Sequence, residues 1–484
     1  MIKPSAFERM LSNVWPSMAV RRYTNRLRFN ALYKASRPSK KNKRSTDRGS
    51  ADAVNIQAAD WLRNKARELE QNYDLVSGAL DILERNVIGL GIRPEFMTKA
   101  TGGKEVHDHF CNRLEKLWDQ HAKLPTVYGE DNIYKVQRLM GRSKVRDGEV
   151  FQQNLMGRVP GLEHSTVIPL SIEPLEADFI PLDFHDPSKN IRQGIRKNAW
   201  GRPIEYIVHK THPGDPFQYT DTGSKRVIAE RMMHLKFCNR FHQGRGISVF
   251  ASTLTRFDDI AELEESERVA ARIAAALTGY VIKGNPDAYE ADKYNADGDR
   301  EIRMSPGMIF DDLAPGEDVG TIASNRPNTQ LNEYLNYQIK MAASGIKCSY
   351  SSLSKNYHSS YSAQRQELVE QFMQYGVLWH DFKEEYVRPY TELFIQMAVL
   401  SGAITLPADL DRTTLLDASY SRPAMPWIRP DQEVKAYKTL TEEGFDSHQN
   451  IIKSRGHKPN EIIEQQRDWK KRTSDLKEDE NEGR

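Results

Sequence analysis

Apolar residues recur at helical spacing along several long stretches of the chain. Between about residues 55 and 89 they repeat every three or four positions, which predicts an amphipathic helix. The repeating positions are Ile56, Ala59, Leu62, Ala66 and Leu69. This helix should end at GLGIRP (89–94), because two glycines and a proline stop helical structure. Residues 104–121 predict another helix.

From about residue 123 to residue 240 the pattern changes to short β runs. The runs are GEVFQQNL, SIEPLEADFIPL, PIEYIVH and RMMHLKF. They are separated by Pro, Gly and Asp residues, which favour turns. We therefore expect residues 90–245 to form an α+β domain.

The longest uninterrupted helical pattern covers residues 248–278. Its central part, RFDDIAELEESERVAARIAAAL, contains no Gly or Pro, and a helix over this range would extend roughly 45 Å. The following segment, up to about residue 322, predicts loop and strand. A shorter helix is expected at 328–346.

Another long helix should begin near Ser362. Its mostly apolar stripe alternates spacings of four and three residues and should pack against the protein. The stripe consists of Val369, Phe372, Gly376, Trp379, Lys383, Tyr386, Tyr390, Leu393 and Met397. Pro389 lies inside this helix and lacks a backbone donor, so we expect a kink there. From Arg429 onward the pattern predicts short helices, and the charged ending SDLKEDENEGR is expected to be disordered.

Composition limits the function classes only weakly. The 484 residues contain 69 Lys and Arg against 67 Asp and Glu, so net charge does not indicate a nucleic-acid partner. Hydrophobic residues make up 38% of the chain, which is polar for one compact globule and suggests a large exposed or shared surface. Cys111, Cys238 and Cys348 are far apart, which favours free thiols in a reducing compartment. No secretory signal or membrane-spanning run is present, so synthesis in a cytoplasm without membrane insertion is expected.

The sequence motifs of common enzymes are missing. There is no GxxxxGK[ST] phosphate loop and no GxSxG nucleophile turn, so we predict that the chain is not an enzyme. Two groups of metal-ligand residues lack zinc-like spacing: His107, His109 and Cys111, and His234, Cys238 and His242. NADGD (295–299) is similar to a calcium loop, but Lys293 and Met304 stand at ligand positions. No metal and no cofactor are expected.

Two segments carry an excess of basic residues. Residues 21–48 contain eleven Lys and Arg and one acid, which fits either a solvated arm or a nucleic-acid contact. The segment from Tyr334 to Gln366 contains no Asp or Glu, four Lys and Arg, and five tyrosines. It predicts either a polar loop arising by chance or a surface that faces phosphates without reading bases. The residues alone leave both alternatives open.

The order of these elements resembles the lambda-like family of phage portal proteins. Several local stretches are also similar to that family, and together they extend from about residue 20 to residue 465. They are YDLVSGALDILERNVIGLGIRPEF (73–96), GEVFQ (148–152), GIRKNAWGRPIEYIV (194–208), FHQGRGISVFASTL (241–254), SSYSAQRQELVEQF (359–372) and WIRPDQEVKAYKTLTEEGFDSHQNII (427–452).

The resemblance implies an α+β portal fold with named regions. These are a basic N-terminal arm (1–50), an α+β wing (51–245), a stem helix (246–278), a small α/β clip (279–327), a second stem helix (328–347), a tunnel loop (348–361), a kinked channel helix with a return to the wing (362–428), and a helical crown with the C-terminal tail (429–484). The tunnel loop is expected to be exposed and mobile.

The resemblance also implies a function and partners. The expected assembly is a ring of twelve subunits at one capsid vertex of a virion assembled in a bacterial host. Double-stranded DNA would pass through its channel without sequence preference during packaging and ejection. Expected protein partners are the terminase motor, capsid and scaffolding proteins, and head-completion or tail connector proteins.

Particular residues acquire roles through the resemblance. The implied DNA-channel residues are Lys347, Ser351, Ser352, Lys355, Asn356, Tyr357, His358 and Arg365. The implied motor-docking residues of the clip are Glu290, Asp292, Asp311, Asp312 and Glu317. Pro389 would form the kink of the channel helix.

Two other functions compete with this interpretation. A packaging ATPase or nuclease would need catalytic motifs, and the missing phosphate loop argues against it. A sequence-specific DNA-binding protein could use FDSHQNIIKSRGHKPNE (445–461), whose turn could imitate a helix-turn-helix. Short amphipathic helices at a domain end are more often packing units.

Overall fold

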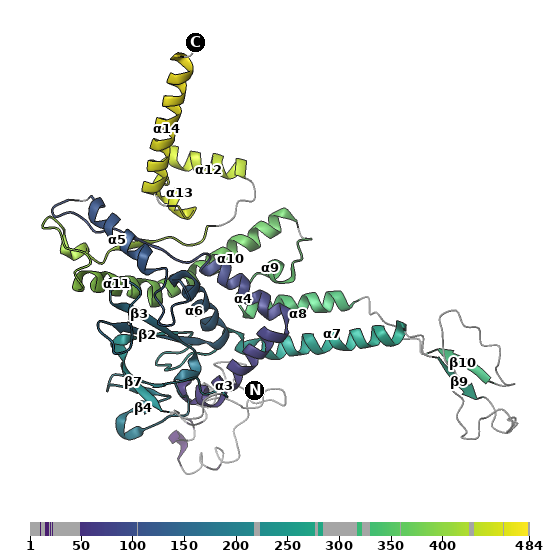
Figure 1. The fold of residues 1–484 in the computed structure, drawn as a ribbon. Coiled ribbons are helices and arrows are strands. Elements are labelled where there is room, and N and C mark those ends of the chain that lie inside the picture. Colours follow the sequence, from purple (N-terminus) through teal and green to yellow (C-terminus); the bar gives the residue numbers. More distant parts are fainter. Residues whose placement is uncertain are drawn as a thin grey trace. The chain divides into compact units, whose positions relative to one another are not determined.

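A computed structural model describes most of the chain (Figure 1). It covers residues 49–103, 105–216, 223–275, 279–283, 317–321, 330–358, 360–424, 430–457 and 459–482, with a few positions between 10 and 22. Met1–Ser50 and Ala51–Arg484 form two separate units. The basic segment 21–48 belongs to the first unit and lies almost entirely outside the described residues, so both interpretations of it remain predictions.

The first long helix is in fact two helices. α3 (Ala51–Asn72) and α4 (Asp74–Val87) are separated at Tyr73, whose backbone is extended with φ −132° and ψ 114°. The Tyr73 ring packs edge-on against Phe257, with centroids 6.1 Å apart, and this contact accompanies the break. α4 stops before Gly89, which has φ 63°, so the predicted stop at GLGIRP is confirmed.

Two further helices follow, one of which the sequence pattern did not reveal. α5 (Asp108–His121) matches the expected helix, and the His107 side chain caps it by accepting from the Phe110 amide. α6 (Ile133–Asp147) occupies a stretch interpreted as β runs. Its boundary signals were available, because Asn132 caps the start and Gly148 ends it at φ 88°.

Two small antiparallel sheets follow, which makes the architecture α+β. The first has the order β3–β2–β8, with β2 at Glu149–Met156, β3 at Leu170–Leu175 and β8 at Met232–Lys236. The second has the order β4–β5–β6–β7, with β4 at Ile191–Arg192, β5 at Ile195–Lys197, β6 at Pro203–His209 and β7 at Ser224–Ile228. The four predicted β runs are therefore confirmed, except that the second one ends in a 3₁₀ turn at Ala177–Phe179.

The 248–278 pattern forms α7 (Leu254–Ala275), which follows a 3₁₀ turn at Val249–Ser252. α8 (Leu331–Gly345) packs beside α7, where Arg256 donates to Gln338 (Figure 1). Between them in sequence, β9 (Gly279–Lys283) pairs antiparallel with β10 (Glu317–Thr321). Glu317 begins β10, whereas Glu290, Asp292, Asp311 and Asp312 lie outside the described residues.

The last long helix contains a π-helical turn. α10 (Tyr361–Phe382) continues through the turn Lys383–Val387 into α11 (Arg388–Leu400), and the Arg388 amide donates to the Lys383 carbonyl five residues back. Pro389 directly follows this turn. A π-helical turn, which is wider than an α-helical turn and contains one additional residue, therefore lies directly before the position where the kink was expected.

One row of buried residues crosses this turn with a spacing of four. They are Leu378, Phe382, Tyr386, Tyr390, Phe394 and Ala398. In a regular α-helix each step of four drifts by about 40° around the axis, and the extra residue of the π turn compensates for that drift. The predicted stripe was therefore partly wrong: Tyr386, Tyr390 and Met397 are buried, but Val369 is 41% exposed.

Three helices end the chain: α12 (Pro430–Glu442), α13 (His448–Ser454) and α14 (Pro459–Glu482). The short helices predicted from Arg429 onward are confirmed. The helix α14 extends to Glu482, within the ending expected to be disordered, and the disorder of that ending stays a prediction. That stretch contains no Gly or Pro after Pro459, so nothing in it interrupts a helix.

A core of apolar and aromatic side chains joins helices α3 to α11 to the three-stranded sheet. Chain segments far apart in sequence meet there. β1 (Pro94–Phe96) pairs antiparallel with β11 (Ala418–Tyr420), and Trp118 packs edge-on against Phe394 with centroids 5.0 Å apart. No helix in the described part of the chain is long and apolar enough to cross a membrane.

Candidate functional site

The segment expected to be an exposed tunnel loop is half buried. Residues 350–354 form a short helix, α9 (Tyr350–Ser354). Cys348, Ser349, Ser351 and Leu353 are all buried. The expectation of a fully exposed loop was therefore wrong for residues 348–354, because Leu353 and Cys348 supply the apolar anchors.

An acidic residue just beyond the acid-free segment holds α9. The Ser351 amide donates to Oε1 of Glu367 at 3.0 Å, and the Ser351 hydroxyl donates to Oε2. Ser349 caps the same helix by accepting from the Ser352 amide at 3.3 Å. Ser351 is only 9% exposed, and its hydroxyl is directed to Glu367. Its role at a channel surface stays a prediction.

The second half of the segment is exposed and basic. Lys355 has a left-handed backbone, with φ 56°, and ends α9. Lys355, Tyr357 and His358 are exposed, whereas Asn356 is half-buried. Arg365 is also exposed on α10 and donates to the Tyr361 hydroxyl at 3.3 Å. These residues have the placement that contact with a phosphate backbone would require.

Lys347 is separated from this exposed group. Its ammonium lies 5.4 Å from the centroid of the Phe237 ring, and its carbonyl accepts from Gln371. Ser351, Ser352, Tyr357 and Arg365 instead line one cavity of about 230 Å³ next to Glu367. The structure thus brings together four of the eight predicted residues around a carboxylate.

A buried ionic cluster between α3 and the strands β2 and β8 is a polar feature that the sequence pattern did not reveal. Glu149, fully buried at the start of β2, accepts from Arg245 at 2.8 Å and from Arg63 of α3 at 3.0 Å. Nε2 of His234 on β8 lies 3.0 Å from the same carboxylate. Arg245 also donates to three carbonyls, those of Ala177, Ile180 and Gln193. One guanidinium therefore joins β2 to the 3₁₀ turn and to the second sheet.

Charge and burial oppose each other in this cluster. Burial alone would raise the pKa of Glu149, but the charge of Arg245 and the hydrogen bond from His234 hold it well below its usual range. Burial lowers the pKa of His234 to about 4, despite the opposing effect of the Glu149 carboxylate. His234 is therefore neutral at pH 7 and donates its Nε2 proton to Glu149.

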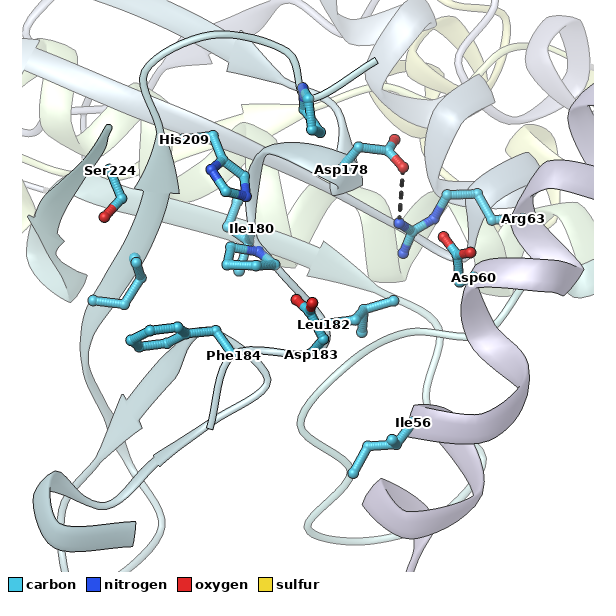
Figure 2. Close-up of a pocket in the computed structure, with 13 residues that line it drawn as sticks. Ile56, Asp60, Arg63, Asp178, Ile180, Leu182, Asp183, Phe184, His209 and Ser224 are labelled. Atoms are coloured by element: carbon cyan, nitrogen blue, oxygen red, sulfur yellow. Dashed lines mark hydrogen bonds and ion pairs between the residues drawn. The ribbon is translucent and has the colours of Figure 1, made fainter. Parts of the chain in front are cut away.

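A wide cavity lies beside this cluster. It has a volume of about 700 Å³, and Figure 2 shows Arg63 and Asp178 joined at one side of it. Arg63 donates to Asp178 at 3.3 Å, and Asp178 also accepts from Arg67 at 2.6 Å. Arg63 is also paired with Glu149, and Arg67 with Asp147, so the charges at this side of the cavity are held in ion pairs.

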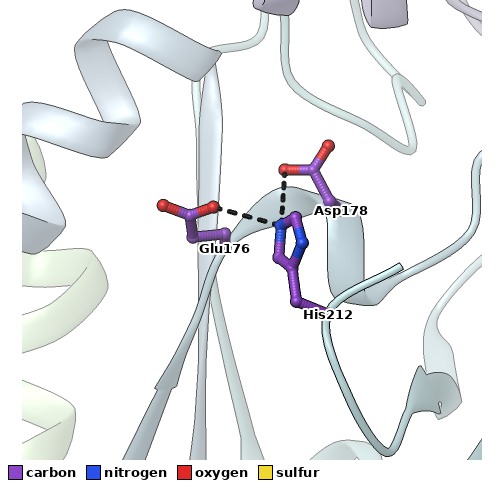
Figure 3. Close-up of side chains that lie close together, drawn as sticks. All are labelled: Glu176, Asp178 and His212. Carbon is purple, nitrogen blue, oxygen red and sulfur yellow. Dashed lines mark ion pairs between the residues drawn. The ribbon is translucent and has the colours of Figure 1, made fainter. Parts of the chain in front are cut away.

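One group of side chains in the described residues has the composition of a metal site. Glu176, Asp178 and His212 point toward one another in Figure 3, with His212 Nε2 3.4 Å from Glu176 and 4.0 Å from Asp178. Arg67 lies 3.5 Å from Glu176 and 2.6 Å from Asp178. The guanidinium already occupies the place of a cation, so these residues do not fit a metal ion well.

A second buried histidine links α5 to α11. His121 Nε2 lies 2.7 Å from the Tyr390 hydroxyl, and the two rings stack with centroids 6.1 Å apart. Burial lowers the pKa of His121 to about 4. The residue is thus a neutral core histidine.

Comparison with known proteins adds independent information. The chain is 23% identical over 462 residues to a probable portal protein of Halomonas phage phiHAP-1, covering 90% of this chain and 85% of that protein. Solved structures with low similarity come from gene transfer agent (GTA) particles. The neck of a native GTA particle computed with C12 symmetry has 10% identity and a TM-score of 0.43, over 82% of this chain and 94% of that one. A native GTA virion has 11% identity and a TM-score of 0.44, over 85% and 95%.

A family description covers most of the chain. The model for phage portal proteins of the lambda family matches residues 37–378, which is more than half of the 484 residues. This range includes the buried cluster, α7, α8 and α9. The chain therefore belongs to the lambda family of phage portal proteins, which are structural proteins and not enzymes, as the sequence predicted.

Proposed function

We propose that this portal protein forms a ring of twelve subunits at one capsid vertex and that DNA enters and leaves the virion through its channel. Heterologous contacts between identical subunits close into rings when the rotation between neighbours allows it. The stem would be α7 and α8, the clip 279–327, the channel helix α10 and α11, and the crown 429–484. The clip would dock the terminase motor, and head-completion or tail proteins would follow it.

The observation that carries the channel assignment is the exposed basic stretch from Lys355 to Arg365. It follows a buried helix and lies within a segment that contains no acid from residue 334 to residue 366. In a ring, each exposed Lys355 becomes one of a belt of positive charges facing phosphates. Release of counterions would make DNA contact salt-dependent and independent of sequence.

Imaging of the purified protein tests the assembly. Negative-stain or cryo-electron microscopy should show closed rings with a central hole. Particles that remain single subunits at every concentration and salt condition would overturn the proposal.

A second experiment tests the channel segment. Lys355→Ala, alone or with His358→Ala, should leave the rings intact and impair DNA packaging or retention. Lys438→Ala is a suitable control, since Lys438 is 72% exposed on α12, far away in sequence. If Lys355→Ala rings hold DNA as the wild type does, the exposed segment does not contact DNA.

The purified ring should hydrolyse no nucleotide by itself, because the driving force would come from the partner motor. Hydrolysis that co-purifies with the ring and disappears on a point substitution in this chain would contradict that assignment.

A further inference from the structure

One face of α10 holds the segment that leads into the exposed stretch. Glu367, Gln371 and Tyr375 are spaced by four residues and therefore lie on the same side of α10. Glu367 accepts both the amide and the hydroxyl of Ser351. Gln371 donates to the Lys347 carbonyl. Two consecutive turns of α10 thus bind the two ends of residues 347–351.

The opposite side of the segment is anchored to other helices. The Cys348 thiol lies 3.8 Å from the Ala79 carbonyl of α4, and the Tyr350 hydroxyl donates to Asn336 of α8 at 2.9 Å. Leu353 is buried in the core. Residues 348–354 are therefore fixed on both sides, and the exposed stretch begins at Lys355, where α9 ends. Two contacts tie this stretch to its flanks: the Asn356 side-chain amide donates to the Tyr350 hydroxyl at 3.4 Å, and Gln364 donates to the Tyr357 carbonyl.

We propose that Glu367 is a positioning residue that sets how far the exposed stretch can reach from α10. This inference rests on the proposed function, in which the stretch faces DNA. Residues 355–360 provide roughly 20 Å of extended chain, so a loop anchored at both ends can extend by about 10 Å. Release of Ser351 would loosen α9 while Leu353 and Tyr350 keep their own contacts, so the base of the exposed stretch would gain freedom without the whole segment detaching.

A carboxylate suits this role better than a neutral side chain. Hydrogen bonds to an ionised acceptor are about twice as strong as neutral ones, and Glu367 accepts two of them from one residue. Its negative charge also lies at the border of a segment that otherwise contains only basic charges. Loss of Glu367 would therefore both free the loop and increase its attraction for phosphate.

Hydrogen exchange of the assembled full-length ring tests the anchoring. Glu367→Gln and Ser351→Ala should each raise the exchange rate of the amides of residues 351–354 by about tenfold or more. Amides in the middle of α4 and α8 should be unchanged. Glu370→Gln is the matched control, because Glu370 is exposed on the same helix. Wild-type exchange in both Glu367→Gln and Ser351→Ala would overturn the inference.

DNA retention provides a second measurement, which general destabilisation would not imitate. Rings with Glu367→Gln should hold DNA at higher salt than the wild type, whereas Lys355→Ala rings should release it at lower salt. If Glu367→Gln also lowers retention, the idea that Glu367 limits the reach is wrong. If Lys355→Ala has no effect while exchange rises in Glu367→Gln, the anchoring stands and the channel function of the loop fails.

Discussion

The buried ionic cluster at β2 and the α9 segment both depend on a carboxylate, but the two carboxylates are held very differently. Glu149 is fully buried and is surrounded by Arg63, Arg245 and His234. Glu367 is half-buried and binds one serine. Removing a partner from a buried charge leaves an uncompensated ion, which destabilises the whole domain. If Ser351 separates from Glu367, the carboxylate and the serine hydroxyl can both bind water instead. The first carboxylate therefore stabilises the fold, whereas the second can be released without unfolding.

The largest expected effect is in the buried cluster. Arg245→Ala should lower the free energy of unfolding by about 3–5 kcal/mol, because Glu149 loses its closest cation and three carbonyls lose a donor. Denaturant unfolding measures the change. Arg226→Ala is the control, since Arg226 is 60% exposed and lies 4.0 Å from Glu205; it should cost less than about 1 kcal/mol. Equal losses in both variants would remove the contrast between buried and exposed pairs.

Acid should destabilise the core through His121. Folded His121 stays neutral down to its pKa of about 4, whereas the unfolded chain binds the proton below about 6.5. The unfolded state thus gains protons first, and stability falls as the pH drops from 6.5 to 4, by about 3 kcal/mol for this residue. Above pH 6.5 His121 has no effect.

Paired substitutions on α5 check that pH dependence. His121→Gln should reduce the slope of unfolding free energy between pH 6.5 and pH 4 without abolishing it, because burial also lowers the pKa of His234 to about 4 and that residue keeps its own contribution. His109→Gln, at an exposed position of the same helix, should retain the wild-type slope. An unchanged slope in His121→Gln would show that other groups cause the acid sensitivity.

The smallest expected effect is at Lys355. Its left-handed backbone favours glycine, so Lys355→Gly should be about 1 kcal/mol more stable than Lys355→Ala. Both variants remove the charge, and both should impair DNA retention equally. Thermal unfolding and DNA release, measured on the same rings, separate the backbone effect from the charge effect. Unequal DNA release would mean that loop conformation, rather than charge, governs the contact.

The sequence predicted the elements with strong periodic patterns and missed those determined by tertiary contacts. The strands β2, β6 and β8 and the stop after α4 followed from local signals. The break at Tyr73 and the burial of Ser351 did not, because each depends on a partner distant in sequence, Phe257 in one case and Glu367 in the other.

The buried ionic cluster also depends on tertiary contacts and could not be predicted from local sequence. Glu149 and Arg245 lie within GEVFQ and FHQGRGISVFASTL, two stretches that carry the family resemblance. Nothing in either stretch alone indicates that they pair across 96 residues. Helical periodicity also predicted that Val369 is buried, although it is 41% exposed, because the predicted stripe assumed a regular α-helix across the π turn.

The π-helical turn at Lys383–Val387 makes the protein sensitive to the number of residues there rather than to their identity. Deleting one residue would restore a regular α-helix and turn the whole of α10 by about 100° relative to α11. Glu367 would then face away from Ser351, and Tyr375 and Leu378 would leave the core. Surface connections usually tolerate changes in length better than the regular elements they join do. In this helix, a one-residue deletion should be more damaging than any single exposed substitution in the same turn.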